Sequence, residues 1–183
     1  RIDHRNYDKL QPTNLTDELA GEVITQNRIH LSDQLDLKPE ETILSIMKGN
    51  TEVVSYAGHD PKIDPGDSNS LYFINTGKIY KLDIRGVEDR TTRPEQEQQF
   101  KIDDPKEIGF DPNGNFIIIR NGKDQLQIIE KETGDFVKSF EGVKGPFIVD
   151  AQGDILYADA NNQLREIQTN FQAIAPGGTE EAQ

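Results

Sequence analysis

The side chains best suited to chemistry gather in one short stretch of this sequence. Asp60, Asp64, Asp67 and Asn69 place three carboxylates and one carboxamide within ten residues. Ca²⁺ prefers oxygen-rich loops of this kind. The spacing is not that of an EF-hand, because the sixth position is not glycine and the twelfth is not glutamate. A calcium site is therefore one hypothesis, and a solvated loop between structural repeats is the alternative that the sequence favours.

A second candidate is the charged insertion over residues 85–94. It concentrates Arg85, Arg90 and Arg93 in a chain whose formal net charge is -13. Long loops between regular elements are common places for recognition, and guanidinium groups pair with carboxylates and phosphates. The insertion is thus a candidate partner-binding loop, and the alternative is a flexible polar loop.

The motifs of several enzyme classes are missing from the sequence. The chain has no cysteine, which excludes disulfides, thiolate nucleophiles and cysteine zinc sites. His4, His30 and His59 follow no metal-ligand spacing. The chain contains no Gly-x-Ser-x-Gly, phosphate loop or dinucleotide fingerprint. We therefore predict no catalytic residue.

Charge and hydropathy limit the partners. A net charge of -13 repels phosphate backbones and anionic membrane surfaces, which argues against nucleic-acid binding. No apolar stretch approaches the roughly 18 residues needed to cross a bilayer. Cationic proteins or divalent cations fit this charge, and so does simple solubility.

The elements that must position these residues come from a hydrophobic pattern that recurs four times. Each copy has a short apolar run, a turn, and two apolar residues three apart. The runs are residues 43–46, 71–74, 116–119 and 155–158. Such units, about 40 residues long, read as paired strands that must stack to bury their faces. We predict an all-β fold of about four antiparallel sheet repeats with a propeller-like arrangement.

The third and fourth repeats share a turn. Asp111 and Gly114 match Asp150 and Gly153, with an apolar strand after each glycine. In a tight hairpin the Asp side chain accepts hydrogen bonds from backbone N–H groups ahead of it, and Gly takes the positive φ. This structural role is favoured over metal binding for both aspartates.

This turn, followed by an apolar run and a second strand, resembles a β-propeller blade of the NHL and SMP-30/gluconolactonase-like group. The resemblance covers residues 110–129 and 149–167, although the chain has no Trp and lacks the Asn-His-Leu triplet that names NHL. The SMP-30 likeness implies a divalent-metal-dependent hydrolase of the lactonase type. Asn75, Asn121 and Asp159, which follow the apolar runs, would be its candidate ligands.

The domain prediction has three parts. Residues 1–40 are expected to form an irregular segment with a short helix, residues 41–174 the β-repeat domain, and residues 175–183 a disordered tail. The short helix is expected near residues 15–20, and a turn or a one-turn helix over residues 32–41. The chain begins without a methionine and has an acidic composition, so we expect an extracytoplasmic protein: periplasmic, secreted or on the cell surface.

The favoured function is a non-catalytic protein- or ligand-binding scaffold. A metal-dependent lactonase and a subunit of a surface appendage are the alternatives. A protein partner is expected, and no cofactor other than possible calcium.

Overall fold

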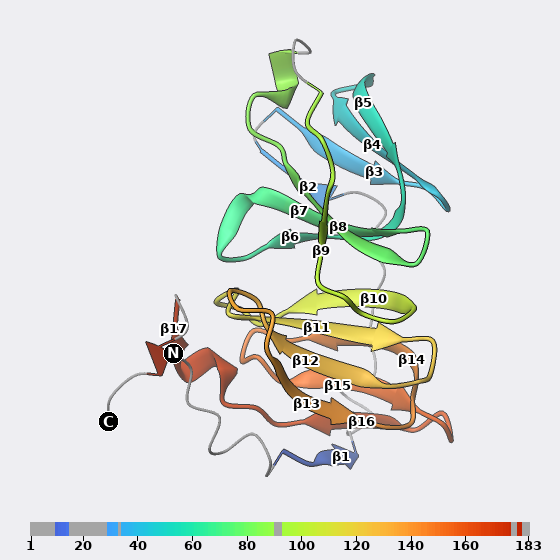
Figure 1. Cartoon of the computed structure of the whole chain (residues 1–183), viewed down its shortest axis with the longest axis vertical. Helices are drawn as coiled ribbons and strands as arrows, with labels where there is room; N and C mark the ends of the chain where they lie inside the picture. The colour runs from blue at the N-terminus through green and yellow to red at the C-terminus, as the bar shows by residue number, and fades with distance from the viewer. Residues whose placement is uncertain (1–9, 15–28, 33, 90–92, 177–178, 181–183) are drawn as a thin grey trace. The chain divides into compact units, whose positions relative to one another are not determined.

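The computed structural model describes residues 10–14, 29–32, 34–89, 93–176 and 179–180. These residues form four four-stranded antiparallel sheets, here called blades one to four (Figure 1). The chain divides into two compact units, residues 25–108 and residues 1–24 with 109–183. Within the described residues, no helix is long and apolar enough to cross a membrane.

Blades one and two make up the unit of residues 25–108. Blade one has the strand order β2-β3-β4-β5, with bounds Ile29–His30, Asp36–Pro39, Ile43–Lys48 and Thr51–Ala57. Blade two has the order β6-β7-β8-β9, with bounds His59–Asp64, Asp67–Asn75, Lys78–Asp83 and Glu97–Gln99. The short 3-10 helix η2, Val87–Asp89, lies between β8 and β9.

Blade three begins with β10, which spans the sequence boundary between the units. Its order is β10-β11-β12-β13, with bounds Pro105–Phe110, Phe116–Asn121, Leu126–Glu130 and Phe136–Phe140. Blade four has the order β14-β15-β16-β1, with bounds Val143–Val149, Ile155–Asp159, Leu164–Ile167 and Pro12–Asn14. The helix η3, Phe171–Ala173, leads into a small pair, β17 (Ile174–Ala175) with β18 (Thr179–Glu180).

The four predicted apolar runs lie in β4, β7, β11 and β15. Each of these is an interior strand, paired on both sides within its blade. Residues 116–119 of β11 are fully buried, which explains a continuous apolar run where a half-exposed strand would alternate. The prediction of an all-β chain with four antiparallel sheet repeats is confirmed.

Each unit has its own hydrophobic core. In the unit of blades one and two, Leu44 and Ile46 of β4 pack with Phe73 of β7 and Leu82 of β8. The second core joins strands of blades three and four to η3. Its largest members are Phe116, Phe140, Phe147, Tyr157 and Phe171.

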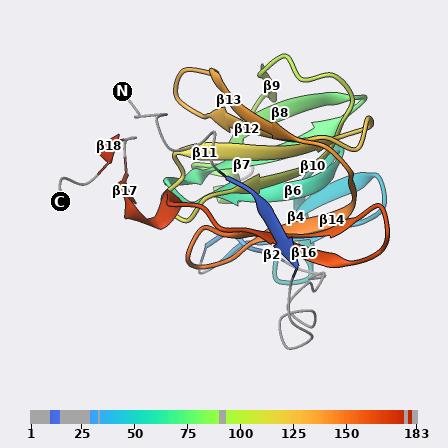
Figure 2. The same cartoon turned by 90° about the horizontal axis from the view of Figure 1, so that it is seen from below.

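The segment expected to be irregular, residues 1–40, contains strands. β1 pairs with β16, so a strand from the start of the chain completes blade four (Figure 2). β3 replaces the turn or one-turn helix expected over residues 32–41, because pairing buries Leu37 against Ile46 of β4. The sheet domain therefore begins before residue 41. The short helix expected near residues 15–20 lies outside the described residues.

The tail expected to be disordered, residues 175–183, also contains paired residues. Thr179 and Glu180 pair with Ala175 and Ile174. Ile174 is buried in the second core, which holds the first strand of this pair in place. Residues 177–178 and 181–183 lie outside the described part of the chain.

Candidate functional site

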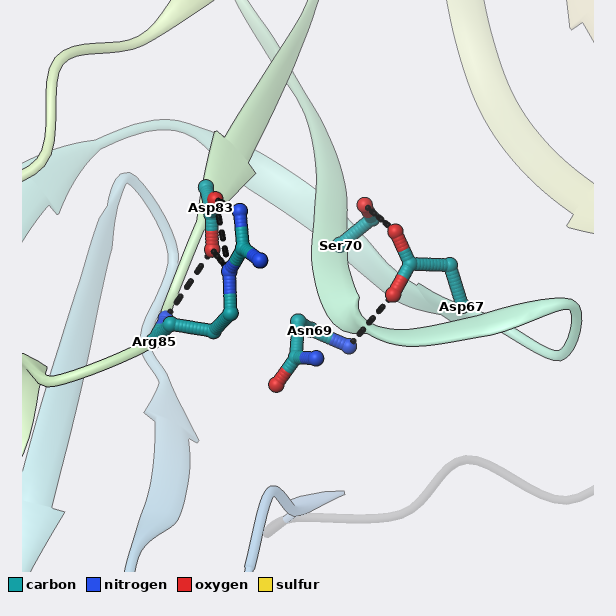
Figure 3. A network of polar contacts seen from close by, with 5 residues as sticks. All are labelled: Asp67, Asn69, Ser70, Asp83 and Arg85. Carbon is teal, nitrogen blue, oxygen red and sulfur yellow. Dashed lines mark hydrogen bonds and ion pairs between the residues drawn. The ribbon is translucent and has the colours of Figure 1, made fainter.

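The two candidate sites of the sequence meet at one end of blade two (Figure 3). β7 and β8 pair with Ser70 opposite Asp83. This register brings Asp67 and Asn69, from the predicted calcium loop, near Arg85, the first arginine of the predicted partner loop. A further backbone hydrogen bond, from Ile84 N to Asn69 O at 2.9 Å, joins the two segments.

Both carboxylate oxygens of Asp67 accept hydrogen bonds within its own turn. Asp67 Oδ1 accepts from the backbone N–H of Asn69 at 3.1 Å, and Oδ2 accepts from the Ser70 hydroxyl at 2.8 Å. The Ser70 hydrogen bond, followed by that from Asn69, lowers the pKa of the Asp67 carboxyl. The carboxylate therefore stabilises the entry into β7.

Arg85 is held by Asp83 on the surface. The Arg85 backbone N–H and side-chain Nε both donate to Asp83 Oδ1 at 3.0 Å, and Nη2 donates to Oδ2. The Arg85 side-chain hydrogen bond lowers the pKa of Asp83 to about 2. The same contact raises the pKa of Arg85. The Arg85 side chain is 72% exposed, so it is accessible although it already has a partner.

The other two predicted calcium ligands have separate roles. Asp64 is buried and accepts from the backbone N–H of Gly66 at 2.8 Å. Asp60 pairs with Lys62 at 3.2 Å and accepts from the backbone N–H of Ile108. Among the described residues, no three His, Cys, Asp or Glu side chains gather as metal ligands would. Asp64 and Asp67 thus hold the backbone of their own loop, whereas Asp60 holds that of β10.

The loop between β8 and β9, residues 84–96, is described over residues 84–89 and 93–96, and Arg93 and Pro94 in its second part contact blade one. Arg93 Nη2 donates to the backbone carbonyl of Ser55 in β5 at 2.9 Å. The Arg93 guanidinium lies over the Tyr56 ring, with 4.5 Å between Cζ and the ring centroid. The Tyr56 hydroxyl donates to the carbonyl of Pro94 at 2.6 Å. Ser55, Tyr56, Arg93 and Pro94 are called the clasp below.

Packing against neighbouring aromatic rings fixes the position of the Tyr56 side chain. Its ring lies 6.3 Å from Phe73, which stacks on Tyr80 at 5.9 Å between ring centroids. Gly58 leaves room for Phe73, since a Cβ at this glycine would lie 2.6 Å from Phe73 Cδ2. Burial raises the pKa of Tyr56, and the Arg93 charge opposes this shift. The hydroxyl thus stays protonated and can donate.

The arginines of the predicted partner loop therefore contact different blades. Arg85 pairs with Asp83 of blade two, and Arg93 contacts β5 of blade one. Arg90 lies outside the described residues. The sequence does not mark Ser55 and Tyr56 as functional, because their contact with Arg93 and Pro94 spans 38 residues. The residues next to Tyr56 in the sequence indicate only that it lies in a β-strand.

Two of the three candidate lactonase ligands use their side chains to hold their own turns. Asn121 is buried, and its Oδ1 accepts from the backbone N–H groups of Lys123 and Gln125. Asp159 Oδ1 accepts from Asn161 and Gln163 in the same way. Asn75 ends β7 in the other unit, where its backbone carbonyl accepts from the Thr76 hydroxyl.

No protein-family model matches the sequence, and no curated protein matches it. Solved structures do. The WD40 β-propeller domain of Doa1 aligns with a TM-score of 0.60 and 14% identity, covering 78% of this chain and 50% of that one. A chain of the mitotic checkpoint complex aligns at 0.57 and 9%, covering 74% and 46%. A putative 6-phosphogluconolactonase from Bacteroides uniformis aligns at 0.52 and 11%, covering 70% and 48%.

These likenesses establish the fold. The chain spans about half the length of each of these structures. Identities this low carry no function with them. The four antiparallel sheets are blades of the β-propeller type.

Proposed function

We propose that this chain is a non-catalytic protein-binding module built on β-propeller blades. One observation carries the proposal: the loop of residues 84–96 is attached to folded blades at both ends. Arg85 binds Asp83 at its start, and Arg93 with Pro94 binds β5 near its end. An anchored loop presents its side chains at low entropic cost, which favours recognition.

The polar residues considered as metal ligands support the same proposal. Asp67, Asn121 and Asp159 all direct side-chain oxygens at backbone N–H groups of their own turns. The net charge of -13 would draw cationic partner surfaces toward the chain. Among the similar structures, the checkpoint chain is by its name part of a protein complex. A partner for this chain remains our inference.

Affinity capture from the native source, with a matched loop variant, tests the proposal. In one variant a Gly-Ser segment of equal length replaces residues 86–94. In the control variant the same kind of segment replaces the hairpin turn at residues 131–134, far along the sequence. Each captured protein is then purified and titrated directly against both variants.

We expect a partner that binds the native chain and the control variant with equal affinity, and the loop variant at least tenfold more weakly. Equal affinity for all three proteins would refute the role of the loop. Failure of every purified candidate to bind the native chain would refute the binding-module proposal itself.

The finer assignment to the SMP-30-like group, with lactonase activity, is the alternative function. It would require Asn121 and Asp159 to exchange their backbone hydrogen bonds for a metal ion. Lactone hydrolysis assayed with and without added Ca²⁺, Zn²⁺ or Mn²⁺ tests it. Metal-dependent turnover that Asp159→Ala abolishes would favour the enzyme over the binding module.

A further inference from the structure

The clasp covers part of a sheet edge. β5 stands at one end of blade one, in the order β2-β3-β4-β5. Edge strands expose backbone groups that can pair with another chain, and proteins often cover them with loops. Here η2 contacts β5, and Arg93 donates to the Ser55 carbonyl at 2.9 Å. The loop of residues 84–96 therefore occupies a place where an extended segment could bind.

The contacts of the clasp have the chemistry of peptide recognition. The Tyr56 ring takes the cation on its face, and the Ser55 carbonyl fixes the direction of the guanidinium. The Tyr56 hydroxyl donates a hydrogen bond to the carbonyl of the next residue, Pro94. Proline pre-sets an extended backbone, which reduces the entropy lost on binding. Together these contacts fit an arginine followed by a residue whose carbonyl faces the Tyr56 hydroxyl, and proline is a residue that holds its backbone ready for this.

Tyr56 of the clasp is fixed, whereas Arg93 is exposed. Tyr56 is 6% exposed and belongs to the core that contains Phe73. Arg93 is exposed to solvent. An exposed cation held by one carbonyl and one ring face can exchange with an identical group from another polypeptide. The acidic chain would also attract a cationic segment over a distance.

We propose that Ser55 and Tyr56 form a binding site for an extended protein segment containing Arg-Pro, which the chain's own Arg93-Pro94 fills in cis. A partner carrying this dipeptide binds by displacing the cis segment. This deepens the proposed function, on which it rests, by naming the site and the chemistry of the partner. The affinity of the native chain is then reduced by the fraction of molecules in which the site is closed.

Binding in trans tests the site. The protein is the full chain with Arg93→Ala, which weakens the cis segment, and the probe is a fluorescein-labelled synthetic peptide with the sequence of residues 88–98. A second peptide has alanine in place of the arginine that precedes proline. Fluorescence anisotropy gives the affinities, and circular dichroism with a thermal melt compares the fold of each protein with the native one.

We expect saturable binding of the native peptide to the Arg93→Ala chain, at least tenfold weaker binding of the alanine peptide, and weaker binding by the native chain because its own segment competes. Tyr56→Phe, added to Arg93→Ala, retains the ring and should weaken binding severalfold through loss of the hydroxyl. Equal binding of the two peptides, or no binding to a folded Arg93→Ala chain, would overturn the site.

A second variant guards against misfolding. If Arg93→Ala does not fold, Arg93→Lys keeps the cation but loses the planar guanidinium, and the same comparison of peptides applies with the same decisive outcomes. The test is independent of the capture experiment. Peptide binding without any captured partner would leave the site standing and refute the proposed cellular role, and the reverse would refute only the site.

Discussion

Asn121 and Asp159 stand at the same position of consecutive repeats and make the same pair of hydrogen bonds. Each Oδ1 accepts from the backbone N–H groups two and four residues further on, at 3.0 and 3.1 Å for Asn121 and at 2.8 and 3.0 Å for Asp159. In both turns the residue three positions on, Asp124 or Asn162, has a φ of 60°. The repeat is thus a repeat of turn chemistry as much as of apolar strands.

Removal of the Asn121 side chain should destabilise the protein measurably. In Asn121→Ala the N–H groups of Lys123 and Gln125 lose their acceptor, and at this buried position we expect a loss of about 1–3 kcal/mol in the free energy of unfolding. Lys123→Ala, in the same turn but exposed, should stay within about 0.5 kcal/mol of the native value. Urea unfolding measures both, and equal stability of the two variants would contradict this role for the amide.

Two glycines allow backbone strain to be separated from packing. Gly142 and Gly153 both have positive φ, +76° and +86°, but a Cβ at Gly142 would meet nothing within 4 Å. A Cβ at Gly153 would lie 2.9 Å from the Cβ of Phe171, which is fully buried and stacks on Phe116. Alanine at either position therefore strains the backbone, but only alanine at Gly153 also crowds a neighbouring side chain.

We expect Gly142→Ala to cost about 1–2 kcal/mol, the penalty for a side chain in the left-handed region. Gly153→Ala should cost about 1–3 kcal/mol more, because Phe171 must move. Thermal and urea unfolding of both variants give the comparison. If both alanines cost the same, Phe171 is not held tightly against this turn.

Local chemistry made much of the fold predictable. The Asp111 turn follows its expected form: its carboxylate accepts from the N–H groups of Asn113 and Phe116, and Gly114 has a φ of 72°. Asp150 accepts from Gln152 and Asp154 in the equivalent turn. These interactions span at most five residues, so the sequence shows both partners together.

Contacts between residues far apart in the chain could not be predicted from the sequence. The pairing of β1 with β16 includes a hydrogen bond from Arg165 to the Pro12 carbonyl, across 153 residues. The clasp likewise joins Pro94 to Tyr56 across 38 residues. No local spacing marks either pair, because the contact depends on where the sheets place each strand. The sequence alone therefore predicts that the arginines of the loop face a partner, whereas the structure also gives Arg85 and Arg93 partners within the chain.

The pKa of Asp83 should depend on Arg85. Its ordinary value is 3.8, and the contact with Arg85 lowers it to about 2. In Arg85→Gln we expect it to return toward 3.8, whereas Lys81→Gln, which removes a weaker charge effect, should move it less. Carbon NMR of the side-chain carboxyl during an acid titration measures both shifts.

The pair of Asp83 and Arg85 also predicts the direction in which stability changes with pH. Because the folded pKa of Asp83 is lowered, its contribution is fully present above pH 3.8 and is lost as the pH falls toward 2. Any stability difference between the native chain and Asp83→Asn should therefore shrink over that range, and it should be small since both groups are exposed. A difference that grows on acidification would contradict the pairing.

Calcium provides the last test, because the predicted ligands already have partners. Asp64 binds the Gly66 N–H, and Asp67 binds Asn69 and Ser70, so a calcium ion would have to break these turns to gain their oxygens. We expect that millimolar Ca²⁺, the range of weak extracellular sites, leaves the melting temperature unchanged relative to chelator. Mg²⁺ at the same concentration controls for ionic screening of the acidic surface. A rise specific to Ca²⁺ that Asp67→Ala removes would establish the calcium site, and would mean that the hydrogen bonds of this loop rearrange around the ion.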